Sequence, residues 1–208
     1  MSSKWIKNLS SMMVVALFAA MTCVTFAGVE NDKPAPDFEL KNSMGKTVKL
    51  SDFKNKYVVL EWINHQCPFV KKHYGPSNMQ ELQKKYTDKG AIWLSICSSA
   101  NGKQGHLDAN GWNQAIKDKK MAATAVLLDE DGSVGKLYGA KTTPHMFIVD
   151  PKGMLTYHGA IDSIKSADVN DVPKAQNYVL TALAQMKAGE AVKPQGTRPY
   201  GCSVKYGS

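Results

Sequence analysis

Residues 57–74, YVVLEWINHQCPFVKKHY, place a cysteine between a strand pattern and a helix pattern. The apolar, β-branched start of this stretch predicts a buried strand over residues 57–62. Proline is favoured at the first position of a helix, so Pro68 puts Cys67 at the turn from strand to helix. Unpaired backbone N–H groups and the positive end of the helix dipole converge at such a turn and favour a thiolate. The sequence therefore predicts thiol chemistry at Cys67.

The first 27 residues have the features of a secretory signal peptide. Lys4 and Lys7 precede an apolar stretch over residues 12–20, and small residues surround a cleavage site expected after Ala27. The apolar stretch is shorter than the roughly 20 residues that span a bilayer, so we expect no stable membrane span after cleavage. The mature chain is expected to be periplasmic or secreted.

The chain of 208 residues has a formal net charge of +8, which raises the question of a nucleic-acid partner. Arg198 is the single arginine, and the lysines are scattered instead of forming a stripe. A solvated lysine surface explains this pattern better, and no nucleic-acid partner is expected.

Strand and helix patterns alternate along the rest of the chain. We expect a hairpin within residues 34–50, strands at 57–62, 91–96 and 125–128, and a closing hairpin at 146–149 and 155–158. Helices are expected from residue 67 to 86, kinked at Gly75-Pro76 with Ser77 capping the restart, and at 112–119, 134–138 and 173–187. This order predicts one α/β domain at residues 28–192, followed by a flexible tail at 193–208.

As a set, these features resemble the redoxin (AhpC/TSA-like) branch of the thioredoxin superfamily, and more specifically its peroxiredoxin-like thioredoxin-fold proteins. The resemblance is carried by APDFEL at residues 35–40, GKTVKLSDFKNK at 45–56, NHQCPFVKKHY at 64–74, Thr143-Pro144, and GCSVKY at 201–206. It implies a thioredoxin-like three-layer sandwich, in which helices flank a central mixed sheet and a β-hairpin extends the N-terminus.

The resemblance also implies roles for single residues. Thr143 and Pro144 match a loop with a cis proline that lies against the reactive cysteine and offers backbone groups to an incoming peptide or disulfide. Apart from the resemblance, His65 and Pro68 flank Cys67 closely in the sequence and are expected to bind substrate with Thr143 and Pro144. An imidazolium at His65 could lower the pKa of the thiol, and a neutral imidazole could act as a base.

The sequence departs from its relatives at the second cysteine. Thioredoxins carry Cys-x-x-Cys, but Val70 stands where the second sulfur would be. Cys23 leaves with the signal peptide, so the candidates for a second thiol are Cys97 and Cys202. Cys97 follows a core strand and is expected to pack as a small apolar side chain. Cys202, in the tail, is the better candidate, either as the resolving thiol of Cys67, as a free thiol, or as a structural staple.

Peroxiredoxins also place a proline seven residues and a threonine or serine three residues before their thiolate, and add an arginine. Here those positions hold Leu60 and Asn64, and Arg198 lies in the tail. Because the usual donors to a peroxide are missing, we expect a low peroxidase rate.

The leading hypothesis is an exported thiol-dependent oxidoreductase with catalytic Cys67 and Cys202 and no cofactor. Its substrate would be a protein or small-molecule disulfide, or a hydroperoxide, and an external thiol would reduce it. The alternative is a binding module without catalysis. It would be a copper(I) carrier that uses His65, Cys67 and His145, or a peptide-binding scaffold with a structural Cys67 to Cys202 bridge.

Overall fold

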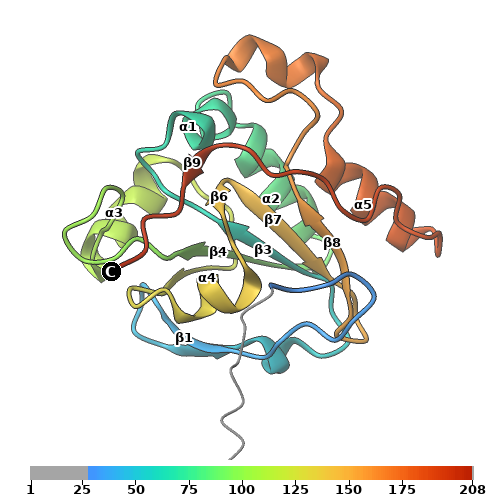
Figure 1. Ribbon diagram of the computed structural model, residues 1–208, viewed down its shortest axis with the longest axis horizontal. Helices are drawn as coiled ribbons and strands as arrows, with labels where there is room; N and C mark the ends of the chain where they lie inside the picture. The colour runs from blue at the N-terminus through green and yellow to red at the C-terminus, as the bar shows by residue number, and fades with distance from the viewer. Residues whose placement is uncertain (1–27, 208) are drawn as a thin grey trace, which may run out of the picture.

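A seven-stranded mixed sheet forms the middle layer of the computed structural model, which describes residues 28–207 (Figure 1). The strands follow the order β2-β1-β5-β4-β3-β7-β8. Their bounds are β1 (Glu39–Asn42), β2 (Thr47–Lys49), β3 (Val58–Trp62), β4 (Ile92–Cys97), β5 (Ala125–Leu128), β7 (His145–Val149) and β8 (Leu155–Gly159). β3, β4 and β5 are parallel, and every other neighbouring pair is antiparallel. The predicted signal peptide lies outside the described residues.

Helices cover both faces of the sheet. One core cluster packs the sheet against α1 (Pro68–Tyr74), α2 (Asn78–Thr87), α3 (Ala109–Asp118) and α5 (Tyr178–Lys187). The other packs it against α4 (Ser133–Tyr138) and the short 3-10 helix η1 (Leu50–Phe53). The predicted thioredoxin-like three-layer sandwich with an N-terminal hairpin is therefore confirmed.

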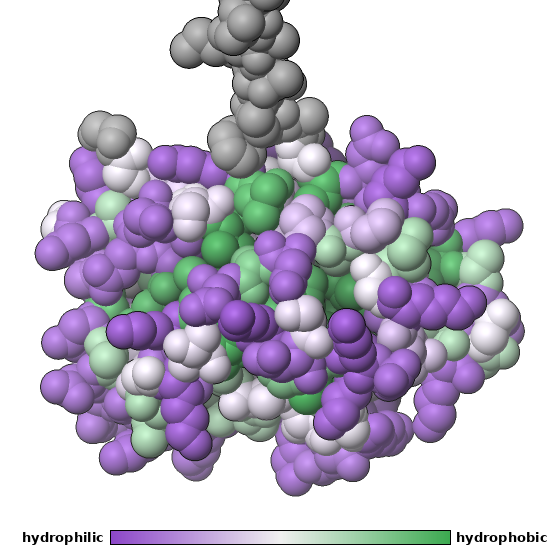
Figure 2. Space-filling view, turned by 90° about the horizontal axis from the view of Figure 1, so that it is seen from below, coloured by the Kyte–Doolittle hydropathy of each residue, from purple (hydrophilic) through white to green (hydrophobic). Residues whose placement is uncertain are grey.

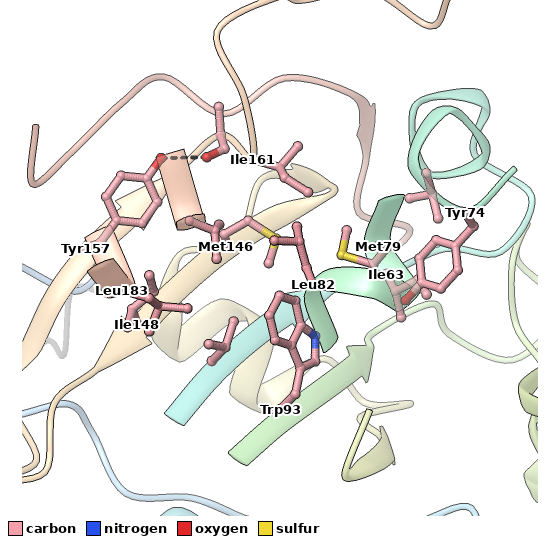
Figure 3. Close-up of a cluster of buried hydrophobic side chains, with 14 of the residues drawn as sticks. Ile63, Tyr74, Met79, Leu82, Trp93, Met146, Ile148, Tyr157, Ile161 and Leu183 are labelled. Atoms are coloured by element: carbon pink, nitrogen blue, oxygen red, sulfur yellow. Dashed lines mark hydrogen bonds between the residues drawn. The ribbon is translucent and has the colours of Figure 1, made fainter. Parts of the chain in front are cut away.

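The central strand β3 serves both cores because its side chains alternate between the two faces. Val58, Leu60 and Trp62 belong to the core that contains α4, and Val59 belongs to the core under α1 and α2. Figure 3 shows part of this second core, in which Trp93 and Met146 from the sheet meet Met79 and Leu82 of α2.

Three helices differ from the sequence prediction, two in where they start and one in how its start is capped. The helix expected from Pro173 is split into a 3-10 helix η2 (Val169–Lys174) and α5, because the Asn177 side chain accepts the Leu180 N–H and starts α5 there. α3 begins earlier than expected, since Asp108 caps it by accepting the Gly111 N–H at 2.7 Å. Ser77 precedes α2 with a left-handed φ of 65°, and its side chain forms no cap hydrogen bond, so the predicted capping role is wrong.

The C-terminal tail lies against the domain along its length (Figure 1). The Thr197 N–H donates to the His158 carbonyl at 3.2 Å. Farther on, a strand β9 (Cys202–Ser203) pairs antiparallel with β6 (Thr142–Thr143). The Tyr206 hydroxyl then donates to the Ala140 carbonyl at 2.7 Å. These contacts give fixed partners to a segment whose sequence predicts a flexible tail.

The surface is mostly hydrophilic on the face that carries the N-terminal hairpin, and hydrophobic side chains are exposed in its centre (Figure 2). Among the helices of residues 28–207, none combines the length and the apolar character that crossing a bilayer requires.

Candidate active site

Cys67 occupies the N-cap position of α1. The preceding turn is built by Asn64, whose carbonyl accepts the Cys67 N–H at 3.0 Å and whose side-chain oxygen accepts the Gln66 N–H at 2.9 Å. Pro68 follows at the first helical position, where a missing N–H costs nothing, and the Cys67 carbonyl accepts from Val70 and Lys71. The sequence therefore places the cysteine where the strand-to-helix pattern predicts it.

The proline loop lies directly against this cysteine. The Thr143–Pro144 peptide bond is cis, as the resemblance implied. The Cys67 Sγ lies 3.1 Å from the Thr143 carbonyl oxygen, to which the thiol donates. Both Cys67 and Thr143 are buried, so the contact is shielded from water.

Cys202 reaches the same loop from the tail. In the β6–β9 pair, Cys202 stands opposite Thr143. Gly201 permits this approach, because its φ is 136° and a Cβ at that position would overlap the Thr143 carbonyl oxygen. All three cysteines of the described residues are free thiols.

The pKa values of the two cysteines are shifted in opposite directions. Burial disfavours the Cys67 thiolate, but the neighbouring Cys202 thiol, then the Thr143 side chain and the nearby backbone of Cys202 and Val70, outweigh burial and lower the pKa of Cys67. Burial, together with the hydrogen bond to Cys67, raises the pKa of Cys202 to about 11. Cys67 therefore ionises first, and Cys202 keeps its proton.

Cys97 has no part in this arrangement. It is buried at the end of β4, where its thiol lies 3.6 Å from the Gly105 carbonyl oxygen. Burial raises its pKa. The prediction that Cys97 packs as a small apolar side chain is confirmed.

The histidines do not join Cys67 in a metal site. His65 lies near it in the sequence, but its ring meets the edge of Trp112, and burial lowers its pKa. His145 packs its ring 4.4 Å from Phe147, in the core on the α4 side. Within residues 28–207, no three His, Cys, Asp or Glu side chains are grouped to hold a metal ion. The structure therefore does not assemble the copper site considered from the sequence.

Sequence reasoning missed a buried polar cluster beside the two cysteines. Lys72 of α1 lies 3.0 Å from Asp162, and the Tyr200 hydroxyl bonds to both of them. All three residues are buried. The sequence offered one sign of this cluster, which was the position of Tyr200 two residues before Cys202.

The family follows from a sequence profile. The profile of the AhpC/TSA family matches residues 32–158, more than half of the chain. The chain belongs to the AhpC/TSA family. The matched part includes Cys67 and the Thr143–Pro144 loop, whereas Cys202 lies beyond it.

Individual relatives agree with this assignment. The chain is 27% identical over 159 residues to the thioredoxin-like protein YneN of Bacillus subtilis, covering 74% of this chain and 88% of the relative. It is 30% identical over 128 residues to the thiol-disulfide oxidoreductase ResA of Bacillus thuringiensis, covering 60% of this chain and 66% of ResA. A solved hypothetical protein of Sinorhizobium meliloti has the same fold, with TM-score 0.73 and 23% identity, covering 87% of this chain and 97% of that one.

This AhpC/TSA protein has valine where thioredoxins have their second cysteine. The Val70 side chain is buried in the core, and its N–H donates to the Cys67 carbonyl at 3.1 Å. Any second thiol has to come from elsewhere, and the tail brings Cys202 opposite Thr143, the residue that Cys67 contacts.

Proposed function

We propose that the protein is an exported thiol oxidoreductase in which Cys67 is the attacking thiolate and Cys202 the resolving thiol. The AhpC/TSA family match and the relatives named as a thioredoxin-like protein and a thiol-disulfide oxidoreductase support thiol redox chemistry. One observation carries the assignment of roles: Cys67 bonds to the Thr143 carbonyl, and Cys202 stands opposite the same Thr143.

The order of the two steps follows from the pKa shifts. A thiolate is the nucleophile in disulfide exchange, and the lowered pKa of Cys67 gives it the larger thiolate fraction. The raised pKa of Cys202 keeps that thiol protonated until Cys67 has reacted. Once Cys67 forms a bond to another sulfur, its thiolate no longer raises the pKa of Cys202, so Cys202 ionises more readily although burial still raises its pKa.

With a disulfide as substrate, the Cys67 thiolate attacks one sulfur and releases the other as a thiolate. The Cys202 thiolate then attacks Cys67 in the mixed disulfide and releases the second substrate thiolate. The substrate gains two electrons, and the protein ends with a Cys67 to Cys202 disulfide. An external thiol, oxidised in turn, restores the dithiol form.

With a hydroperoxide, the Cys67 thiolate would take the terminal oxygen, giving a sulfenic acid and releasing an alcohol. Condensation with the Cys202 thiol then releases water and forms the same disulfide. Arg198 is exposed, and Leu60 and Asn64 replace the residues that assist peroxide cleavage in peroxiredoxins. We therefore place disulfide exchange first and peroxide reduction as a slow second activity.

Access to Cys67 requires the tail to move. The Cys67 side chain is fully buried, while Cys202 is partly exposed. Pro68 is exposed and His65 is partly exposed beside the covered sulfur. These two residues, with the Thr143–Pro144 loop, would contact a substrate once the tail lifts.

Export supplies the compartment for this cycle. The signal-peptide pattern of residues 1–27 directs the chain to the periplasm or the cell exterior, where disulfides persist. The substrate would then be a protein or small-molecule disulfide of that compartment.

The test uses dithionitrobenzoate, an aryl disulfide that releases a coloured thiolate at each exchange step. The reduced mature protein should release two coloured thiolates and end with an internal disulfide. Cys202→Ala should release one and keep the aryl group on Cys67, which mass spectrometry detects. Cys67→Ala should lose the fast release. Equal fast release from Cys67→Ala and the unmodified protein would overturn the assignment.

A further inference from the structure

A buried ion pair lies behind the active site. Lys72 Nζ lies 3.0 Å from Asp162 Oδ2, and both side chains are almost fully buried. Two buried charges lose their hydration, so such a pair is stable only when its remaining polar atoms are also bonded. The ammonium of Lys72 meets this condition, because it also donates to the Ile164 carbonyl at 2.8 Å and to the Tyr200 hydroxyl at 3.2 Å.

Tyr200 connects this pair to the tail. Its hydroxyl donates to Asp162 Oδ1 while it accepts from Lys72. Burial and the hydrogen bond to Asp162 raise the pKa of Tyr200, so it stays a donor at every physiological pH. Its ring packs edge-on against Phe69, with 5.8 Å between the ring centroids. The tail is thus fixed at Tyr200 by both charge and packing.

The same helix carries the fixed point and the nucleophile. α1 begins directly after Cys67 and supplies both Phe69 and Lys72. Tyr200 is separated from Cys202 only by Gly201, which lies against the Thr143 carbonyl. Because Tyr200 packs against α1, its position sets where Cys202 lies relative to Cys67.

We propose that Lys72, Asp162 and Tyr200 form a positioning latch that holds Cys202 against Cys67 and sets the rate of the resolving step. This inference rests on the proposed function. Two cysteines so far apart in the chain meet rarely unless one of them is held in place, and holding it raises its effective concentration. Tyr200 acts through Cys202 and is a positioning residue, not a catalytic one.

The rest of the tail has its own attachments, so loosening the latch should act locally. Thr197 accepts the Ala160 N–H at 2.9 Å before the latch, and Tyr206 bonds to Ala140 after it. Loss of the Tyr200 hydroxyl therefore leaves the tail on the domain but removes the attachment two residues before Cys202, so that the short β6–β9 pair alone holds Cys202 at the proline loop.

The test compares Tyr200→Phe with Tyr57→Phe in the dithionitrobenzoate reaction. Each variant loses one hydroxyl, but that of Tyr57 donates to the Met186 carbonyl, away from the tail. In Tyr200→Phe the second release should slow by about tenfold or more, which corresponds to a lost hydrogen bond to a charged group. The first release should be unchanged or faster. Tyr57→Phe should match the unmodified protein in both steps.

A second variant separates a loose latch from a misfolded domain. Asp162→Asn retains an oxygen for one donor but removes the negative charge of the carboxylate. Like Tyr200→Phe, it should therefore slow the second release. Thermal unfolding of each variant checks that the domain is folded. If both folded variants release the second thiolate within about twofold of the unmodified rate, the latch is wrong. If the unmodified protein itself releases only one thiolate, the proposed function fails instead.

Discussion

Cys67 Sγ lies 3.1 Å from the carbonyl oxygen of Thr143, the residue that begins the cis peptide bond. Thr143 also stands opposite Cys202 in the β6–β9 pair. One residue of the proline loop thus positions both thiols, although one thiol comes from the start of α1 and the other from the end of the chain. This shared contact is the basis for the proposed pairing of Cys67 with Cys202 in a chain without Cys-x-x-Cys.

The pKa of Cys67 should depend on Cys202. The neighbouring Cys202 thiol helps to lower the pKa of Cys67. Cys202→Ala removes this thiol, so the pKa of Cys67 should rise. Thiolate absorbance in a pH titration of the reduced protein measures it directly, and the first thiol to ionise is Cys67, because the pKa values of Cys97 and Cys202 are raised. If the first thiol transition of Cys202→Ala occurs at the same pH as in the unmodified protein, the Cys202 thiol does not contribute to the lowered pKa of Cys67.

Gly201→Ala should detach the tail from the proline loop. The new Cβ would overlap the Thr143 carbonyl oxygen, so β9 cannot keep its register beside β6. We expect Cys67 to be alkylated faster and the internal disulfide to form less completely. Gly189→Ala is the matched control, because Gly189 also has a positive φ but a Cβ added there would meet no heavy atom within 4 Å. Equal effects of the two substitutions would indicate general strain instead of tail release.

Cys97→Ala should leave the redox cycle intact. Cys97 is buried away from the proline loop and its pKa is raised. We expect the same two-step release of coloured thiolate as in the unmodified protein, with a stability loss of about 1 kcal/mol from the small cavity. Loss of the second release in this variant would make Cys97 the resolving thiol and remove Cys202 from that role.

Glu61 should make the domain less stable as the pH rises. Its buried carboxylate accepts from Trp93 at 2.8 Å and from Ser95 at 3.0 Å, yet burial still raises its pKa. The folded state therefore holds the Glu61 proton more tightly than the unfolded state does, and the resulting stability is lost between the ordinary pKa of 4.5 and the raised one. Denaturant unfolding across this pH range should show a fall in the free energy of unfolding as the pH rises. This fall should be smaller in Glu61→Gln.

Glu61→Leu gives a second measure of the same group. The indole of Trp93 and the hydroxyl of Ser95 would lose their acceptor inside the core, so we expect a destabilisation of roughly 3 kcal/mol or more at neutral pH. Leu60→Val, on the opposite face of β3, tests packing without removing a hydrogen-bonding group. A Glu61→Leu variant as stable as the natural chain would mean that these donors find other partners.

Much of the fold was predictable because the patterns are local. The apolar run before Cys67 and the proline after it specify a strand, a turn and a helix within a few residues. The start of α5 was misplaced because Pro173 reads as a first helical residue, while the Asn177 side chain that caps α5 was overlooked.

The site was less predictable because its parts are distant in the chain. β6 and β9 have two residues each, too few for a recognisable strand pattern. Lys72 reads as a solvated lysine, and only the fold shows that Asp162 and Tyr200 surround it. The sequence could indicate Cys202 as a candidate, but not the contacts that bring it to Cys67.

Disulfide mapping of the oxidised mature protein tests the central claim most directly. The reduced protein is treated with a limiting amount of a disulfide oxidant, digested without reduction and analysed by mass spectrometry. We predict one internal disulfide, between Cys67 and Cys202, with Cys97 recovered as a thiol. Recovery of Cys202 as a free thiol, with Cys67 bound to the oxidant or to a second protein molecule, would contradict the account.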